Sequence, residues 1–127
     1  MISQKDEGRR MKDEPEDLRE RTMVFGLRIV KMFGQLPKTD EARTIGRQVL
    51  RSGTSIGANY REAKRARSKP EFIAIAGICL KEADETSYWL EMLVRSEIVA
   101  IPKLKPLRDE CDELIAIFVT IIKNAKG

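Results

Sequence analysis

The sequence contains no histidine, few aromatic residues and no long uninterrupted hydrophobic run. Histidine is the usual general base near neutral pH and the commonest metal ligand, so its absence argues against most acid–base catalysis and metal binding. The two cysteines, Cys79 and Cys111, fit neither a C-x-x-C pair nor a zinc cluster. We therefore expect no enzymatic activity, no cofactor and no metal site, and we expect a reducing, cytoplasmic location.

The other scarcities narrow the class of protein further. A membrane span needs about 18 consecutive apolar residues, and no run approaches that length, so we expect no membrane partner. Aromatic residues make up only 6% of the chain, which is little for stacking single-stranded bases. With 42% hydrophobic and 35% charged residues among 127, the chain can bury one core beneath a heavily ionised surface.

The chain divides into a short charged tail and one domain. Residues 1–14 mix acidic and basic side chains and contain few large apolar residues, so we predict a flexible tail there. Residues 15–127 follow a helical apolar period throughout. The predicted helices span about 15–36, 39–66, 68–98 and 107–127, with Pro102 and Pro106 in the last turn. Four helices joined by short turns predict an all-α, antiparallel up-down four-helix bundle.

Basic residues are concentrated on the outer side of the second predicted helix. Between Asp40 and Lys69 there are eight basic and three acidic residues, and five of the arginines fall within an arc of about 80° opposite the core. We define the basic strip as Arg43, Arg47, Arg61, Lys64, Arg65, Arg67 and Lys69, the candidate nucleic-acid-binding residues. We expect a continuous ribbon of positive charge that binds phosphates without reading bases. The alternative is a solvated face with local ion pairs.

A polar band lies between this strip and the core. We interpret it as a hydrogen-bonded network that fixes the helix register, formed by Arg51, Ser52, Ser55, Asn59 and Glu62 with Glu82 and Glu85 of the third helix. A catalytic serine would lack its usual histidine base. The two glutamates of the third helix lack the Glu-x-x-His partner of a bundle metal site. Within the band, Arg51 is expected to pair with Glu82 or Glu85.

Three glycines, Gly46, Gly53 and Gly57, interrupt the second helix. Each costs about 1 kcal/mol relative to alanine, so a compensating contact is expected. We favour close approach of another helix, from the same subunit or a neighbour; a kink is the alternative.

The last helix is apolar over an arc of about 200°, more than a bundle core uses. Self-association through Trp89, Ile115, Val119 and Ile122 is the preferred explanation. Trp89 fits a core position equally well, and overlap by the N-terminal tail is the alternative cover for the last helix.

Three runs of residues carry a family resemblance. They are RSGTSIGANYREA at 51–63, SKPEF at 68–72 and KEADETSYWL at 81–90. In this order and spacing they resemble the bacterial four-helix-bundle proteins encoded within intervening sequences of 23S rRNA genes. That family includes the accessory variability proteins (Avd) of diversity-generating retroelements. The resemblance covers about residues 18–123; Ala63 departs from it, because many members have glycine there.

The resemblance implies a homopentameric ring with a basic surface and no established enzymatic activity. For the accessory variability branch it also implies contact with a reverse transcriptase and with RNA or DNA. Taken with the basic strip, it predicts a non-enzymatic, oligomeric accessory protein that binds nucleic acid through the backbone. The alternative is a protein-interaction scaffold, in which the arginines dock an acidic partner.

Overall fold

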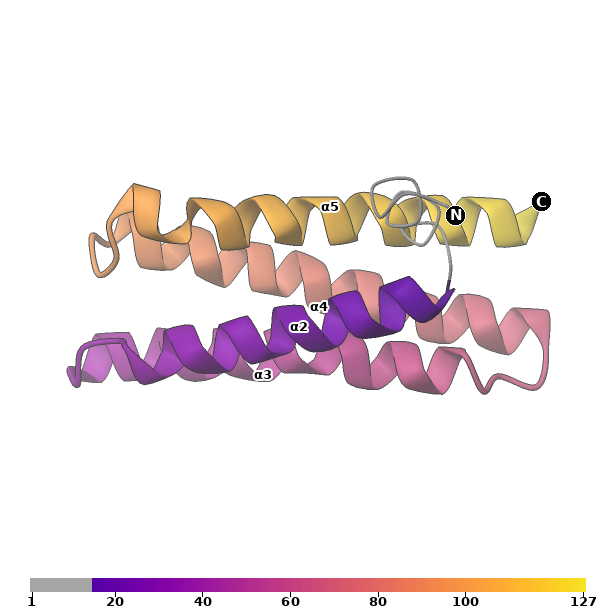
Figure 1. Cartoon of the computed structure of the whole chain (residues 1–127), viewed down its shortest axis with the longest axis horizontal. Coiled ribbons are helices and arrows are strands. Elements are labelled where there is room, and N and C mark those ends of the chain that lie inside the picture. The colour runs from indigo at the N-terminus through magenta and orange to yellow at the C-terminus, as the bar shows by residue number, and fades with distance from the viewer. Residues whose placement is uncertain (1–14) are drawn as a thin grey trace, which may run out of the picture.

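The computed structural model describes residues 15–127, with side chains from Leu18 onward. The predicted charged tail, residues 1–14, lies outside the described residues. The described chain forms four helices, α2 (Pro15–Gly34), α3 (Asp40–Ala63), α4 (Lys69–Arg95) and α5 (Ile101–Lys126), and contains no strand. Figure 1 shows successive helices side by side, with turns connecting them at alternating ends of the molecule. This part of the protein is therefore an all-α four-helix bundle.

Side-chain caps fix where the two central helices begin. The hydroxyl of Thr39 accepts a hydrogen bond from the backbone N–H of Ala42 at 3.3 Å. The hydroxyl of Ser68 likewise accepts from the N–H of Glu71 at 3.2 Å. Each bond satisfies an amide that has no partner inside the first helical turn. Both starting points agree with the sequence prediction.

The start of α5 differs from that prediction. The expectation that Pro102 and Pro106 both lie in the turn is wrong, because α5 begins at Ile101 and includes them. Pro102 sits in the first turn, where a backbone N–H would have no helical partner in any case. Pro106 removes only one hydrogen bond, early in the helix. Neither proline therefore breaks the helix at these positions.

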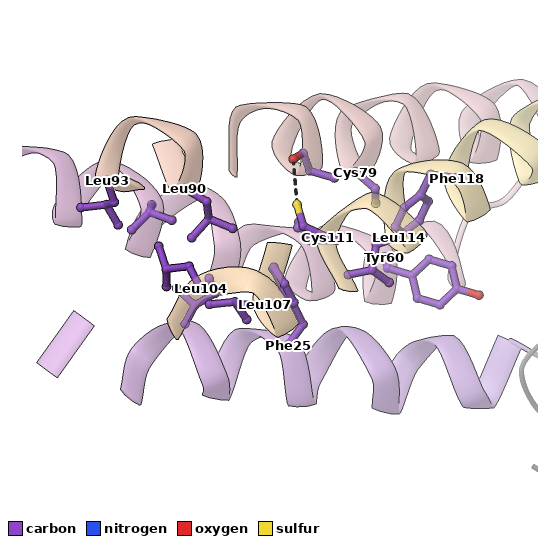
Figure 2. Close-up of a cluster of buried hydrophobic side chains, with 14 of the residues drawn as sticks. Phe25, Tyr60, Cys79, Leu90, Leu93, Leu104, Leu107, Cys111, Leu114 and Phe118 are labelled. Atoms are coloured by element: carbon purple, nitrogen blue, oxygen red, sulfur yellow. Dashed lines mark hydrogen bonds between the residues drawn. The ribbon is translucent and has the colours of Figure 1, made fainter. Parts of the chain in front are cut away.

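The core runs the length of the bundle and draws on all four helices. Phe25, Ile56, Leu90 and Phe118 are fully buried, and Figure 2 shows the aromatic and leucine side chains clustered between the helices. The thiols of Cys79 and Cys111 are also buried and free, and burial raises the pKa of each to about 12. The Cys111 thiol donates to the carbonyl oxygen of Ala83 at 3.4 Å (Figure 2).

The glycines of α3 allow α2 to approach closely. A Cβ atom added to Gly53 would lie 2.8 Å from Cγ1 of Ile29 in α2. One added to Gly57 would lie 3.3 Å from the backbone carbonyl carbon of Thr22. The expectation of close helix approach is confirmed, and the approaching helix belongs to the same subunit. The helix itself is continuous from Asp40 to Ala63.

An ion-pair cluster joins α2 to α5, the adjacent helices with the fewest contacts. The guanidinium of Arg21 donates to both carboxylate oxygens of Glu110 at 2.8 Å and to Glu113 at 2.7 Å. These bonds raise the pKa of Arg21, and its side chain is only 16% exposed. This cluster could not be predicted from the sequence, because its members lie on helices far apart in the chain.

None of the four described helices is both long enough and apolar enough to cross a membrane.

Candidate nucleic-acid interface

The cations of the basic strip lie on the surface of the bundle. All seven are exposed, and within residues 18–127 none forms an ion pair. They come from α3, from the turn that joins it to α4 and, in the case of Lys69, from the first residue of α4. Their charges therefore remain available to an anionic ligand, as the function predicted from the sequence requires.

Arg51 lies at the edge of the same arc but faces α4. Its guanidinium donates to Glu82 at 3.1 Å and to the carboxylate of Glu85. The pairing raises the pKa of Arg51 and lowers that of Glu85. Because two carboxylates already compensate its charge, we place Arg51 in the α3–α4 contact and outside the anion-binding surface.

With Arg51 engaged, the strip forms two groups and differs from the continuous ribbon expected. Arg43 and Arg47 lie near the start of α3, and the remaining members begin at Arg61. Arg61 lies fourteen positions after Arg47, which is about 21 Å along a helix. Apart from the paired Arg51, the exposed residues of α3 between them are uncharged: Gln48, Thr54 and Ala58.

Residues outside the strip enlarge each group. Arg19 of α2 lines a hollow of about 170 Å³ together with Arg61, Glu20 and Met23. At the other end, Lys38 lines a hollow of about 320 Å³ with Arg43 and Arg47. Neither cation was predicted from the sequence to belong to the site. Their proximity to the strip depends on how α2 is aligned with α3, which the periodicity of either helix alone does not reveal.

The predicted polar network is narrower than expected. Ser52 and Thr86 are fully buried, and their hydroxyl oxygens lie 2.9 Å apart, linking α3 to α4. Ser55 and Asn59, in contrast, donate to carbonyl oxygens of their own helix, at 2.6 and 2.8 Å. Glu62 is exposed and has no ion-pair partner among the described residues. The polar contacts between α3 and α4 therefore consist of two parts. One is the Arg51 cluster, in which Arg51 pairs with Glu82 and Glu85, and the other is the buried hydroxyl pair of Ser52 and Thr86.

The predicted oligomer-interface residues occupy mixed environments. Val119 is 48% exposed, and Ile122 is partly exposed. Trp89 and Ile115 are partly buried against the core, and the Trp89 ring meets Tyr88 edge to face with centroids 4.9 Å apart. Trp89 therefore packs partly against the core and is partly exposed to solvent.

No group of three or more Cys, Asp or Glu side chains within the described residues is arranged to hold a metal ion. The basic strip presents guanidinium and ammonium groups. Arginine binds phosphate through paired N–H donors, and lysine binds it as a compact charge.

The fold and the face together define a small all-α bundle protein with an exposed cationic surface. The sequence profile of the 23S rRNA-intervening sequence proteins matches residues 16–120, and the chain belongs to that family. It is similar to a crystal structure of a protein of unknown function from the S23 ribosomal protein family of Bacteroides thetaiotaomicron VPI-5482. The two chains are 38% identical with a TM-score of 0.80, over 86% of this chain and 97% of the other. No curated protein gives a significant match.

Proposed function

We propose that this protein is a non-enzymatic accessory factor that binds RNA or DNA through the phosphate backbone. The observation that supports this most directly is the exposed and unpaired state of the basic strip among the described residues. Such a surface attracts any polyphosphate chain and releases counterions on binding. The strip consists of arginine and lysine without an aromatic side chain, and we expect its contacts to be to phosphates and therefore independent of base sequence.

Assembly strengthens the proposed binding. We propose that the bundle, in the up-down arrangement, forms a homo-oligomer through the exposed parts of Trp89, Ile115, Val119 and Ile122. The family resemblance favours a pentameric ring. Several copies of a weak cationic surface then act on one nucleic acid, which raises the overall affinity without new contacts. A role beside a reverse transcriptase, in the cytoplasm, belongs to the same proposal.

Charge reversal tests the binding surface. We expect a variant with Arg43, Arg47, Arg61 and Arg65 all changed to Glu to lose binding to labelled RNA and DNA at low salt, measured by fluorescence anisotropy. The matched control carries the same change at Lys81, Lys103, Lys123 and Lys126, four exposed lysines elsewhere. Circular dichroism establishes that both variants remain helical.

The control distinguishes a local surface from net charge. If both variants lose binding equally, the attraction comes from overall charge and the strip has no special role. If the strip variant binds as wild type does, the proposal is wrong. Polyglutamate serves as a second ligand, because equal affinity for it and for nucleic acid would favour the protein-interaction scaffold.

A further inference from the structure

An apolar stripe runs along the outer face of α2. Met23, Leu27 and Val30 are 46%, 59% and 49% exposed. Their spacing of four and then three residues places them on one side of the helix, the arrangement by which a helix contacts another helix. Nothing in the described chain covers them, although three large apolar side chains in a row are unusual on a solvated face.

The stripe borders a groove between α2 and α3 of about 250 Å³. Gly26 and Gly57 lie in it without side chains of their own. A Cβ atom on Gly26 would make only an ordinary contact, 3.7 Å from Cα of Thr54, so close packing of α2 on α3 does not require glycine there. The hydroxyls of Thr22 and Thr54 donate to carbonyls of their own helices, at 2.9 and 2.7 Å. The groove therefore accommodates apolar side chains without leaving a hydroxyl donor unpaired.

Cations flank this groove at both ends. Arg19 and Arg61 line one end, and Glu20 lies in the adjoining hollow. Beyond the other end are Lys38, in the turn between α2 and α3, and Arg43 and Arg47, in the first part of α3. The two groups are separated by about 21 Å, the length of about four helical turns.

We propose that the α2–α3 face is a docking groove for an acidic amphipathic helix of another protein. Apolar side chains of that helix, spaced by three and four residues, would enter the groove beside Leu27. Carboxylates about four turns apart would meet the arginines at its two ends. Helices that bind in grooves use this spacing of anchors. The inference goes beyond nucleic-acid binding, because it rests on the apolar stripe and on Arg19.

A second copy of this chain is a poorer occupant than such a partner. A helix that fits the groove would have apolar residues in its centre and carboxylates at its ends. On α5 the order is reversed, because Asp109 and Asp112 lie between the exposed apolar residues Ile101 and Val119. On α4, Glu71 and Glu85 do flank the exposed Ile78, but both carboxylates are engaged. Glu71 accepts from the backbone N–H of Arg67 at 2.9 Å, and Glu85 accepts from Arg51.

The proposed helix and a nucleic acid would compete. Both would use Arg43, Arg47 and Arg61, whereas only the helix would cover Leu27. Binding of the partner is then expected to displace nucleic acid, which makes the groove a means of regulating the basic face.

Synthetic peptides of about 20 residues, long enough to span the groove as a helix, test the proposal. The probe has leucines at helical spacing in its centre and glutamates at both ends. One comparison peptide has lysines at the ends, and another has serines in place of the leucines. We expect the probe to bind the full-length protein, measured by calorimetry, at least about tenfold more tightly than either comparison peptide. Equal binding of all three would overturn the proposal.

Protein variants locate the binding. We expect Leu27→Ser to weaken probe binding about tenfold and Arg19→Gln to weaken it about threefold. Ile101→Ser, which removes an exposed apolar side chain outside the groove, is expected to have no effect. Wild-type affinity of Leu27→Ser for the probe would contradict the proposal.

Two further readouts separate this inference from the proposed function. Leu27→Ser is expected to keep its affinity for nucleic acid and its oligomeric mass by light scattering. Loss of mass would show that the groove is a contact between subunits, and loss of nucleic-acid binding would assign it to nucleic acid; either result overturns the inference. Failure of the charge-reversal test alone would leave the peptide result standing.

Discussion

Gly53 and Gly77 show how the same residue type serves different ends in two helices of one bundle. At Gly53 the missing side chain lets Ile29 of α2 occupy the space, whereas a Cβ atom at Gly77 would meet nothing within 4 Å. Both glycines lie inside helices, where alanine is intrinsically preferred. Only their surroundings can therefore make the same substitution act in opposite directions.

We expect Gly53→Ala to lower the free energy of unfolding by about 1–3 kcal/mol, because the buried Ile29 must move. Gly77→Ala, the matched control, is expected to raise it by about 0.5–1 kcal/mol through helix propensity. Urea unfolding at equal protein concentration measures both. Stabilisation by Gly53→Ala would show that α2 does not approach α3 as closely as the structure has it.

Several residues of the site could be predicted from the sequence, and others could not. The outward position of Arg43, Arg47 and Arg61 follows from helical periodicity alone, whereas Arg65 lies in the turn that follows α3. Arg19 was missed because its nearness to Arg61 depends on contacts between two helices. Sequence spacing likewise suggested a network role for Asn59, but its amide is satisfied within α3.

At the scale of elements, α3 and α4 share the most extensive contact of the bundle. It combines apolar packing with the buried hydroxyl pair of Ser52 and Thr86 and with the exposed Arg51 cluster. Helix types and capped starts were predictable, because capping residues and apolar period are local signals. The start of α5 was not, since a proline in an early helical turn and a proline in a loop look alike in sequence.

The Arg51 cluster gives the α3–α4 contact a pH dependence. The hydrogen bond and charge of Arg51 lower the pKa of Glu85 in the folded protein. The stabilisation is therefore fully present above the unfolded pKa of about 4.3 and is lost as the pH falls through the folded value.

We expect Glu85→Gln to destabilise the protein by less than about 1 kcal/mol at pH 7, because the pair is exposed to solvent. The difference from wild type is expected to shrink as the pH falls towards 3. Urea unfolding at both pH values measures it. An equal loss at the two values would show that the effect of the substitution is not electrostatic.

At the scale of the whole molecule, the outer face of α2 and α3 alternates between cationic and apolar segments. Cations at the turn between these helices are followed by the apolar groove and then by the second cationic group around Arg61. The two groups are about 21 Å apart, or about six steps of a B-form strand at 3.4 Å per nucleotide. One nucleic-acid strand can thus meet both groups while leaving the groove between them unoccupied.

The division into two groups follows from the pairing of Arg51 with Glu82 and Glu85, which the sequence predicted, because no other cation lies between Arg47 and Arg61. No acidic residue lies between Arg47 and Arg61. The one arginine between them, Arg51, would have joined the two groups, but its charge is compensated by Glu82 and Glu85. Helical periodicity correctly placed the charge on the surface. The distribution of charge over two helices required their mutual alignment.

The salt dependence of nucleic-acid affinity tests the central claim most directly. We take Arg43, Arg47, Arg61 and Arg65 as four phosphate contacts per subunit. For duplex DNA, log K is then expected to fall with log salt concentration with a slope of about −3 to −4. The slope is steeper if several subunits engage one duplex. The variant with Arg61→Gln and Arg65→Gln is expected to reduce the magnitude of that slope by about 2 for each engaged subunit. A wild-type slope near zero, or an unchanged slope in the variant, would contradict binding through the basic strip.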